Sequence, residues 1–247
     1  MKRFILKLGK VEIHLSTFFF LFLSFISGRF QSFFFLFIIA LIHELFHVFG
    51  ALLFKVRVDK INIYPFGFSA KMGALVNIEW YKELVIVLLG PMSYFFSKAL
   101  INLLHKLSFL SFVGYQNANS VNLFILCFNL LPIIPLDGSR IIKTFLSFFL
   151  TEKKCLKING LISILCLFSY ILYMPVQFTI YIFLIYSQSE YWYNLRYSYS
   201  LFLISRLKKF KLFPKIHNKN DLYRNYQNII IQNGKIYNEE GYIRLFL

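Results

Sequence analysis

His43-Glu44-Leu45-Phe46-His47 lies inside an apolar run, from Phe30 to Phe54, that is long enough to cross a membrane. Positions i and i+4 of a helix share one face, so His43 and His47 can point at one metal ion. Glu44 lies beside them, where it can take a proton from metal-bound water. An ionisable group in mid-bilayer costs about 2.5–3.5 kcal/mol, so such groups usually line a polar cavity. The stretch therefore predicts a zinc-binding helix within a membrane. A chance pattern in a buried helix is the alternative.

The composition indicates an integral membrane protein. Of the 247 residues 58% are hydrophobic, Phe alone contributes 32, and the mean hydropathy is +0.61. The formal net charge of +16 could suit nucleic acid, but the basic residues cluster between apolar runs, as in loops beside an anionic leaflet. We therefore expect a lipid bilayer as a partner and no nucleic acid. Cys127, Cys155 and Cys166 lack paired metal-ligand spacing and are expected to be apolar fillers.

The order of the apolar runs predicts an all-α membrane fold, a polytopic bundle of about six transmembrane helices. The first is expected to be a retained span and not a cleaved signal. Lys and Arg gather in alternate loops, which by the positive-inside rule predicts that both termini are cytoplasmic. The predicted spans are residues 15–27, 32–54, 84–104, 120–131, 158–172 and 176–187.

Between spans two and three, residues 56–64 are rich in β-branched side chains and end in a turn at Pro65-Phe66-Gly67. This segment predicts a short β-strand or hairpin at the membrane surface. An extended substrate segment could add to the edge of such a sheet. A simple cytoplasmic loop is the alternative.

A catalytic zinc needs three protein ligands and one open position, so one ligand must come from outside the His43–His47 helix. Asp137 follows Pro132 and Pro135, which prevent a regular helix there. Irregular backbone at membrane depth is tolerated where it is buried in protein or lines a wet cavity. Asp137 is accordingly either the third ligand or the N-cap of a helix that begins near Gly138.

Taken together, these two segments resemble the paired motifs of the site-2 proteases, which are zinc-dependent intramembrane metalloproteases. The second motif reads Asn129-x-x-Pro132-x-x-Pro135-Leu136-Asp137-Gly138, and Gly90-Pro91 in span three also matches. The resemblance extends over roughly residues 12–190. Six short spans without an inserted periplasmic module look most like the bacterial sporulation branch, which processes the precursor of a sigma factor.

This resemblance implies a zinc metalloendopeptidase that cleaves a membrane-associated precursor, with a sporulation sigma-factor precursor as the expected substrate. Zinc would be held by His43, His47 and Asp137, with Glu44 as the general base. A membrane inhibitor or regulator protein is a further implied partner. The alternatives are a housekeeping protease of the same fold, a non-catalytic membrane scaffold and a metal transporter.

The resemblance also implies that Asn129 and Pro135 position the substrate backbone, although a helix–helix hydrogen bond is an equal alternative for Asn129. The chain departs from the family pattern at Phe68, Tyr94 and Ser139. None of these departures removes an expected ligand or the expected base.

Two domains are expected, a membrane protease domain of residues 1–195 and a basic cytoplasmic tail of residues 196–247. Sporulation-branch relatives usually carry a nucleotide-sensing domain of the cystathionine-β-synthase type after the last span. Because this tail is short for such a domain, it is expected to be a reduced regulatory domain or an amphipathic segment on the membrane. His14, His105 and His217 are not expected to be ligands, and His217 is expected at the surface.

Overall fold

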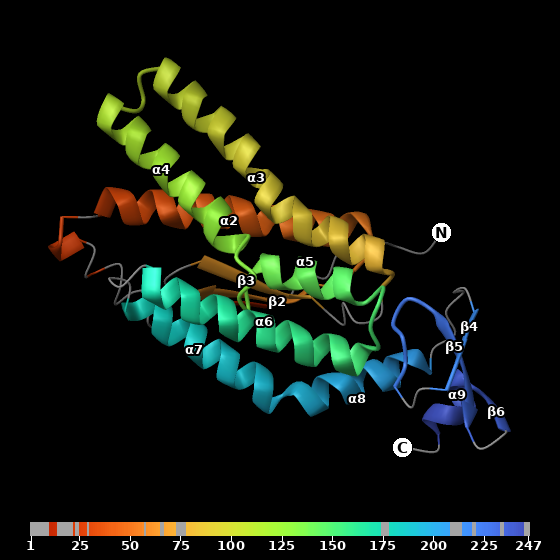
Figure 1. Ribbon diagram of the computed structural model, residues 1–247. Helices are drawn as coiled ribbons and strands as arrows, with labels where there is room; N and C mark the ends of the chain where they lie inside the picture. The colour runs from red at the N-terminus through yellow and green to blue at the C-terminus, as the bar shows by residue number, and fades with distance from the viewer. Residues whose placement is uncertain are drawn as a thin grey trace, which may run out of the picture. The chain divides into compact units, whose positions relative to one another are not determined.

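The computed structural model describes the chain in two compact units, one of residues 1–75 and 84–130 and one of residues 76–83 and 131–247. Figure 1 shows their helices and strands in chain order. The described residues are 10–13, 22, 25–28, 30–56, 58–64, 67–72, 78–173, 178–207, 214–218, 221–232 and 235–244.

The first unit is built on the helix that carries the two histidines, α2 (Phe30–Leu53). Helix α4 (Phe112–Asn129) packs along α2, and helix α3 (Trp80–Lys106) contributes its residues from Leu84 onward. The core of this packing is aliphatic, and its members are Ile39, Ile101, Ala118 and Ile125. Asn122 of α4 also donates a hydrogen bond to the backbone oxygen of Tyr94 in α3, at 3.1 Å.

A three-stranded sheet of order β1-β2-β3 completes the first unit. Strands β2 (Val58–Tyr64) and β3 (Gly67–Met72) form an antiparallel hairpin, which confirms the predicted hairpin and rejects the simple loop. Strand β1 (Lys10–Ile13) pairs in parallel with β2 and was not predicted, because four residues carry too short a pattern. The position of the hairpin at the membrane surface stays a prediction.

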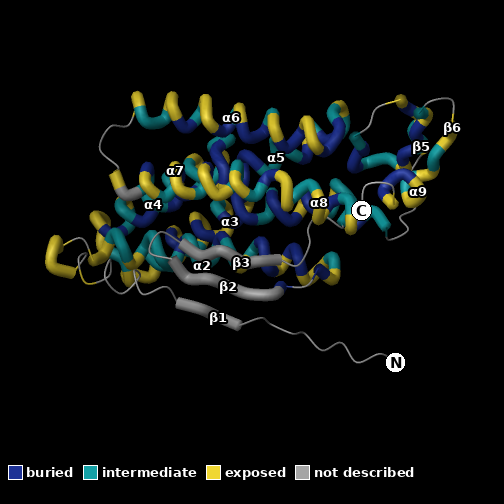
Figure 2. Tube along the Cα trace, turned by 90° about the horizontal axis from the view of Figure 1, so that it is seen from below, coloured by how far each residue is buried: buried dark blue, intermediate teal, exposed yellow. Residues whose placement is uncertain are grey.

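The second unit begins with the short helix α5 (Asp137–Leu146), followed by α6 (Glu152–Tyr173) and α7 (Phe178–Tyr193). In Figure 2 the exposed residues of α6 lie mainly along one side of the helix. Its inward side includes the fully buried Ser163 and the small Gly160. A Cβ on Gly160 would lie 2.8 Å from Cζ2 of Trp192, so this glycine permits the close packing of α6 on α7.

The basic tail, the C-terminal domain of the sequence prediction, folds around a core of its own within the second unit. Helix α8 (Leu195–Arg206) is followed by a second sheet, in which β5 (Gln227–Gln232) pairs in parallel with β4 (Pro214–His217) and antiparallel with β6 (Lys235–Asn238). The short helix α9 (Glu239–Ile243) ends the described chain. The core residues of the whole tail are Phe202, Leu222, Ile230, Tyr242 and Ile243. The domain division at residue 195 and the regulatory role of this tail stay predictions.

Three described helices, α2, α3 and α6, are long and apolar enough to cross a membrane. They coincide with predicted spans two, three and five and support an integral membrane protein. Helices α4 and α7 lie at predicted spans four and six but are not among the three, since α4 carries several amide side chains and α7 has 16 residues. The predicted first span lies mostly outside the described residues. The count of six spans is therefore not confirmed.

Candidate metal centre

His43 and His47 lie on one face of α2, as the sequence pattern predicted, and both are buried, with 6% and 3% of their surface exposed. Their Nε2 atoms are 3.2 Å apart, and the ring planes are inclined at 83°. Two imidazoles on one tetrahedral zinc, with Zn–N bonds of about 2.0–2.1 Å, place their nitrogens about 3.3 Å apart. The pair therefore has the separation that a shared zinc ion requires.

Gly90 of α3 makes room for the two imidazoles. A Cβ built on Gly90 would lie 2.1 Å from Nε2 of His47 and 2.9 Å from Nε2 of His43, closer than real Cβ atoms approach other atoms. The backbone of α3 thus comes up to the metal-facing nitrogens themselves. The sequence marked Gly90 only through its resemblance, and the structure supplies the physical reason for a glycine there.

A backbone hydrogen bond orients His47. Its Nδ1–H donates to the carbonyl oxygen of Ile86 in α3, at 2.8 Å. In this tautomer the lone pair of the imidazole is on Nε2, the atom that faces His43. Metal-binding histidines commonly use their second nitrogen in this way. Residue type gives no signal for this contact, because any residue at position 86 would present the same carbonyl.

Asp137 lies in the second unit, where it is the first residue of α5 and is 7% exposed. The N-cap of α5 is Leu136, so the alternative of Asp137 as the N-cap is wrong by one residue. The turn before it is closed by hydrogen bonds from Leu136 N–H to Ile133 O, at 2.7 Å, and from Ser139 Oγ to Leu136 O, at 2.8 Å. Pro135 is exposed in this turn.

A buried polar network fixes the segment that leads to Asp137. The backbone N–H of Ile134 donates to Ser163 Oγ of α6 at 2.8 Å, and that hydroxyl donates to Gln188 Oε1 of α7 at 2.7 Å. Gln188 Nε2 in turn donates to the backbone oxygen of Gly160, at 3.1 Å. The sequence analysis missed Ser163 and Gln188, although polar residues within apolar spans are a usable signal.

Among the described residues, one group of three or more His, Cys, Asp and Glu side chains could hold a metal ion, and it consists of His43, His47 and Asp137. Two imidazoles and one carboxylate suit zinc and leave a fourth position for water or substrate. Glu44, the predicted base, is half-buried on α2. The residues present thus fit the metal that the sequence predicted.

The other predicted site residue is Asn129, at the end of α4. Its Nδ2 donates a hydrogen bond to Ile125 O of the same helix at 2.9 Å. This donor therefore does not form the helix–helix hydrogen bond that was the predicted alternative. The substrate-binding roles of Asn129 and Pro135 stay predictions.

Of the remaining histidines, the two that the structure describes, His105 and His217, do not join the metal group. His105 donates from Nδ1 to Leu110 O at 3.0 Å, where α3 ends. His217 is buried and donates from Nε2 to Asn228 Oδ1 at 3.0 Å, so its predicted surface position is wrong. His14 lies outside the described residues. The three cysteines are free thiols.

Comparison with known proteins gives two sequence relatives. The chain is 28% identical over 210 residues to Stage IV sporulation protein FB of Bacillus subtilis (strain 168), covering 80% of this chain and 71% of that protein. It is 31% identical over 115 residues to Zinc metalloprotease MJ0392 of Methanocaldococcus jannaschii, covering 45% of this chain and 33% of that protein. The second match thus spans about a third of the relative's length. No family model matches the chain.

The fold is also that of a solved structure. The Site-2 Protease from Methanocaldococcus jannaschii aligns with a TM-score of 0.55 and 24% sequence identity, over 87% of this chain and 99% of that one. These findings confirm the resemblance drawn from the two motifs, including its sporulation branch.

Proposed function

Because this chain is a homologue of the site-2 proteases and resembles their sporulation branch, we propose that it is an intramembrane zinc metalloendopeptidase. The observation that carries the proposal is the pair of imidazoles on α2, with Nε2 atoms 3.2 Å apart and the backbone of α3 against them at Gly90. Asp137 supplies the third ligand. A scaffold without chemistry would have no use for this geometry.

In the proposed reaction the chain's own groups bind the substrate and move its protons. Bound zinc would polarise the scissile carbonyl and lower the pKa of a bound water to about 7. Glu44 takes the proton of the attacking water and passes it to the leaving amine. The burial of His43 and His47 keeps bulk water from the reacting atoms.

The substrate we propose is a membrane-associated protein precursor, of the sigma-factor type in the sporulation branch. Its extended segment would add to an edge of the β1-β2-β3 sheet, whose backbone N–H and C=O groups can pair with it. Asn129 would hydrogen-bond the peptide backbone, and Pro135 would shape the groove. A membrane regulator protein would restrain the enzyme.

We further propose that both termini face the cytoplasm, since Lys and Arg concentrate in alternate loops and in the tail. This arrangement would allow a cleaved regulator to leave on the cytoplasmic side.

The test is cleavage of a co-expressed sigma-factor precursor by the native chain and by Glu44→Gln, with zinc measured in each purified protein. Because general-base catalysis contributes about 10²- to 10⁴-fold, we expect Glu44→Gln to retain zinc and to cleave slower by that factor. Glu190→Gln, at an exposed position of α7, is the matched control and should cleave normally.

Three results would distinguish the alternatives. Equal cleavage by the native chain and Glu44→Gln would refute the role of Glu44. Zinc binding without cleavage of any membrane precursor would favour the scaffold, and zinc flux into vesicles would favour the transporter. Cleavage of membrane precursors other than a sigma factor would favour the housekeeping protease.

A further inference from the structure

The loop of residues 221–226 in the C-terminal domain carries a buried arginine, Arg224. Its guanidinium forms an ion pair with the buried carboxylate of Glu83, in the first turn of α3. Both residues belong to the second unit. Burial by itself lowers the pKa of Arg224, but the carboxylates of Glu83 and Glu152 more than offset that effect and raise it. The pair is therefore charged and tightly coupled.

The residues on either side of Arg224 bind the connection between α5 and α6. The carbonyl oxygen of Leu222 accepts a hydrogen bond from Glu152 N–H at 2.9 Å. Asn225 Nδ2 donates to Ser147 Oγ, also at 2.9 Å. The ion pair ties the same short loop to the first turn of α3, so the loop links that turn to the connection between α5 and α6.

This connection is in turn bonded to α5 itself. Lys143 of α5 forms an ion pair with the buried Glu152 at 3.2 Å. The backbone oxygen of Lys143 also accepts a hydrogen bond from Cys155 Sγ at 3.2 Å. Ser147 Oγ donates to Thr144 O at 2.6 Å. Helix α5 has only ten residues, and its first is Asp137. A movement of its last turn is therefore transmitted to Asp137.

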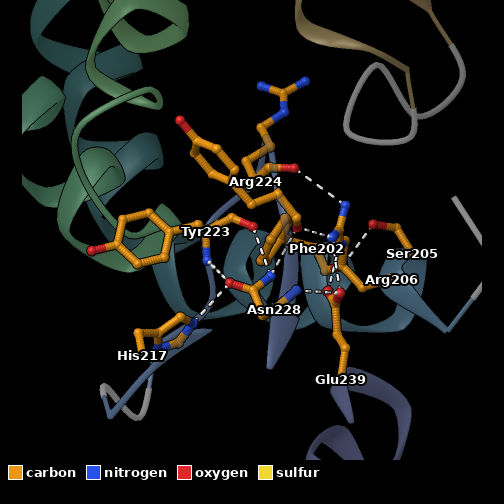
Figure 3. Close-up of polar contacts among 9 residues, drawn as sticks. Phe202, Ser205, Arg206, His217, Tyr223, Arg224, Asn228 and Glu239 are labelled. Carbon is orange, nitrogen blue, oxygen red and sulfur yellow. Dashed lines mark hydrogen bonds and ion pairs between the residues drawn. The ribbon is translucent and has the colours of Figure 1, made fainter. Parts of the chain in front are cut away.

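Other residues of the C-terminal domain hydrogen-bond to the backbone of the 221–226 loop, as Figure 3 shows. Asn228 accepts from Tyr223 N–H at 2.7 Å and donates to Tyr223 O at 2.9 Å. Arg206 donates to the backbone oxygens of Arg224 and Tyr226, and it pairs with Glu239. In the same view the Arg224 side chain points away from this cluster. These hydrogen bonds hold the backbone around Arg224 in place.

We propose that Arg224 is a positioning residue for Asp137, through which the C-terminal domain holds α5 where its first residue can serve as the third metal ligand. The inference rests on the proposed zinc function. It assigns the C-terminal domain a defined task at the metal centre. Loosening the loop would lower zinc affinity even though no residue of the domain is a ligand.

The experiment uses the full-length chain in lipid nanodiscs. The variants are Arg224→Gln and the double variant Glu83→Gln/Arg224→Gln, and the matched control is Arg244→Gln, which breaks the exposed pair of Arg244 with Glu240. Zinc affinity is measured by competition with a chelator, and hydrogen exchange is measured on the amides of α5. Removing a group that hydrogen-bonds a metal ligand directly typically weakens metal binding about 10- to 100-fold, and because Arg224 acts through α5 the expected loss is about 10-fold. We expect that loss in both variants, with faster exchange in α5, and neither change in the control.

The double variant guards against misfolding, because it leaves no unpaired buried charge. If Arg224→Gln does not fold, the double variant decides the outcome. Native exchange in α5, or native zinc affinity despite faster exchange, would overturn the positioning role. A lower melting temperature with unchanged zinc affinity would mean that Arg224 is merely structural. If the native chain binds no zinc, the proposed function fails instead, and the exchange data still decide whether the loop holds α5.

Discussion

Replacing Gly90 by alanine tests the geometry of the metal centre most directly. The new Cβ would lie 2.1 Å from Nε2 of His47, and an ordinary contact needs at least 3.4 Å. The imidazole or the helix must therefore move by about 1.3 Å, whereas metal–ligand distances tolerate about 0.2 Å. His47 cannot move without also stretching its 2.8 Å bond to Ile86 O. We expect the strain to fall on zinc binding.

The size of this effect follows from the cost of overpacking. Forcing a methyl group into a packed site costs about 1–3 kcal/mol, which corresponds to about 5- to 150-fold weaker zinc binding. In overall stability the change is smaller, because alanine favours a helix over glycine by about 1 kcal/mol. Gly90→Ala should thus lose zinc affinity while its zinc-free melting temperature changes little.

The assay is chelator competition on purified protein, with thermal unfolding of the zinc-free form in parallel. Gly114→Ala in α4 is the matched control, because its Cβ would lie 3.0 Å from the flexible end of Gln31, and neither histidine nor Ile86 is among its nearest atoms. It should keep native zinc affinity. Native zinc affinity in Gly90→Ala would refute the placement of α3 against the imidazoles.

Two further changes test the supports of the site. Ser163→Ala removes the acceptor of Ile134 N–H and should lower the free energy of unfolding by about 1–3 kcal/mol. Ser189→Ala, at an exposed hydroxyl, is the control. Equal melting temperatures of these two variants would contradict the role of the buried network. Phe202→Ala empties the core of the C-terminal domain and should destabilise that domain by about 3–5 kcal/mol. Limited proteolysis should then cut the domain faster, unlike in the exposed Leu201→Ala, and equal cutting of both variants would argue against a folded core.

The elements with strong local patterns were predictable from the sequence. The apolar run around His43 predicted span two at 32–54, and α2 spans Phe30–Leu53. The β-branched segment before Pro65 predicted the hairpin. The start of α4 at Phe112 was missed, because its first half carries Gln116, Asn117 and Asn119 and lacks the apolar run used to find spans.

The C-terminal tail shows where local reading fails. Its composition left a reduced domain and an amphipathic surface segment both open, and Phe202, Leu222 and Ile230 meet in one core although they are far apart in the sequence. His217 is buried for the same reason, since the strand that carries it pairs with β5. Pairing of distant strands is decided by packing, which a local pattern does not contain.

The sequence by itself determined the membrane character and the helical pair His43 and His47, because hydropathy and helical periodicity are local properties. The role of Asp137 as third ligand came from the resemblance to a known family and stays a prediction. Only the tertiary structure decided what supports these residues. The carbonyl of Ile86 that orients His47, the space at Gly90 and the reach of Arg224 to Glu83 depend on which backbones approach each other. These backbone approaches arise from packing between distant segments, so the residue types at these positions do not predict them.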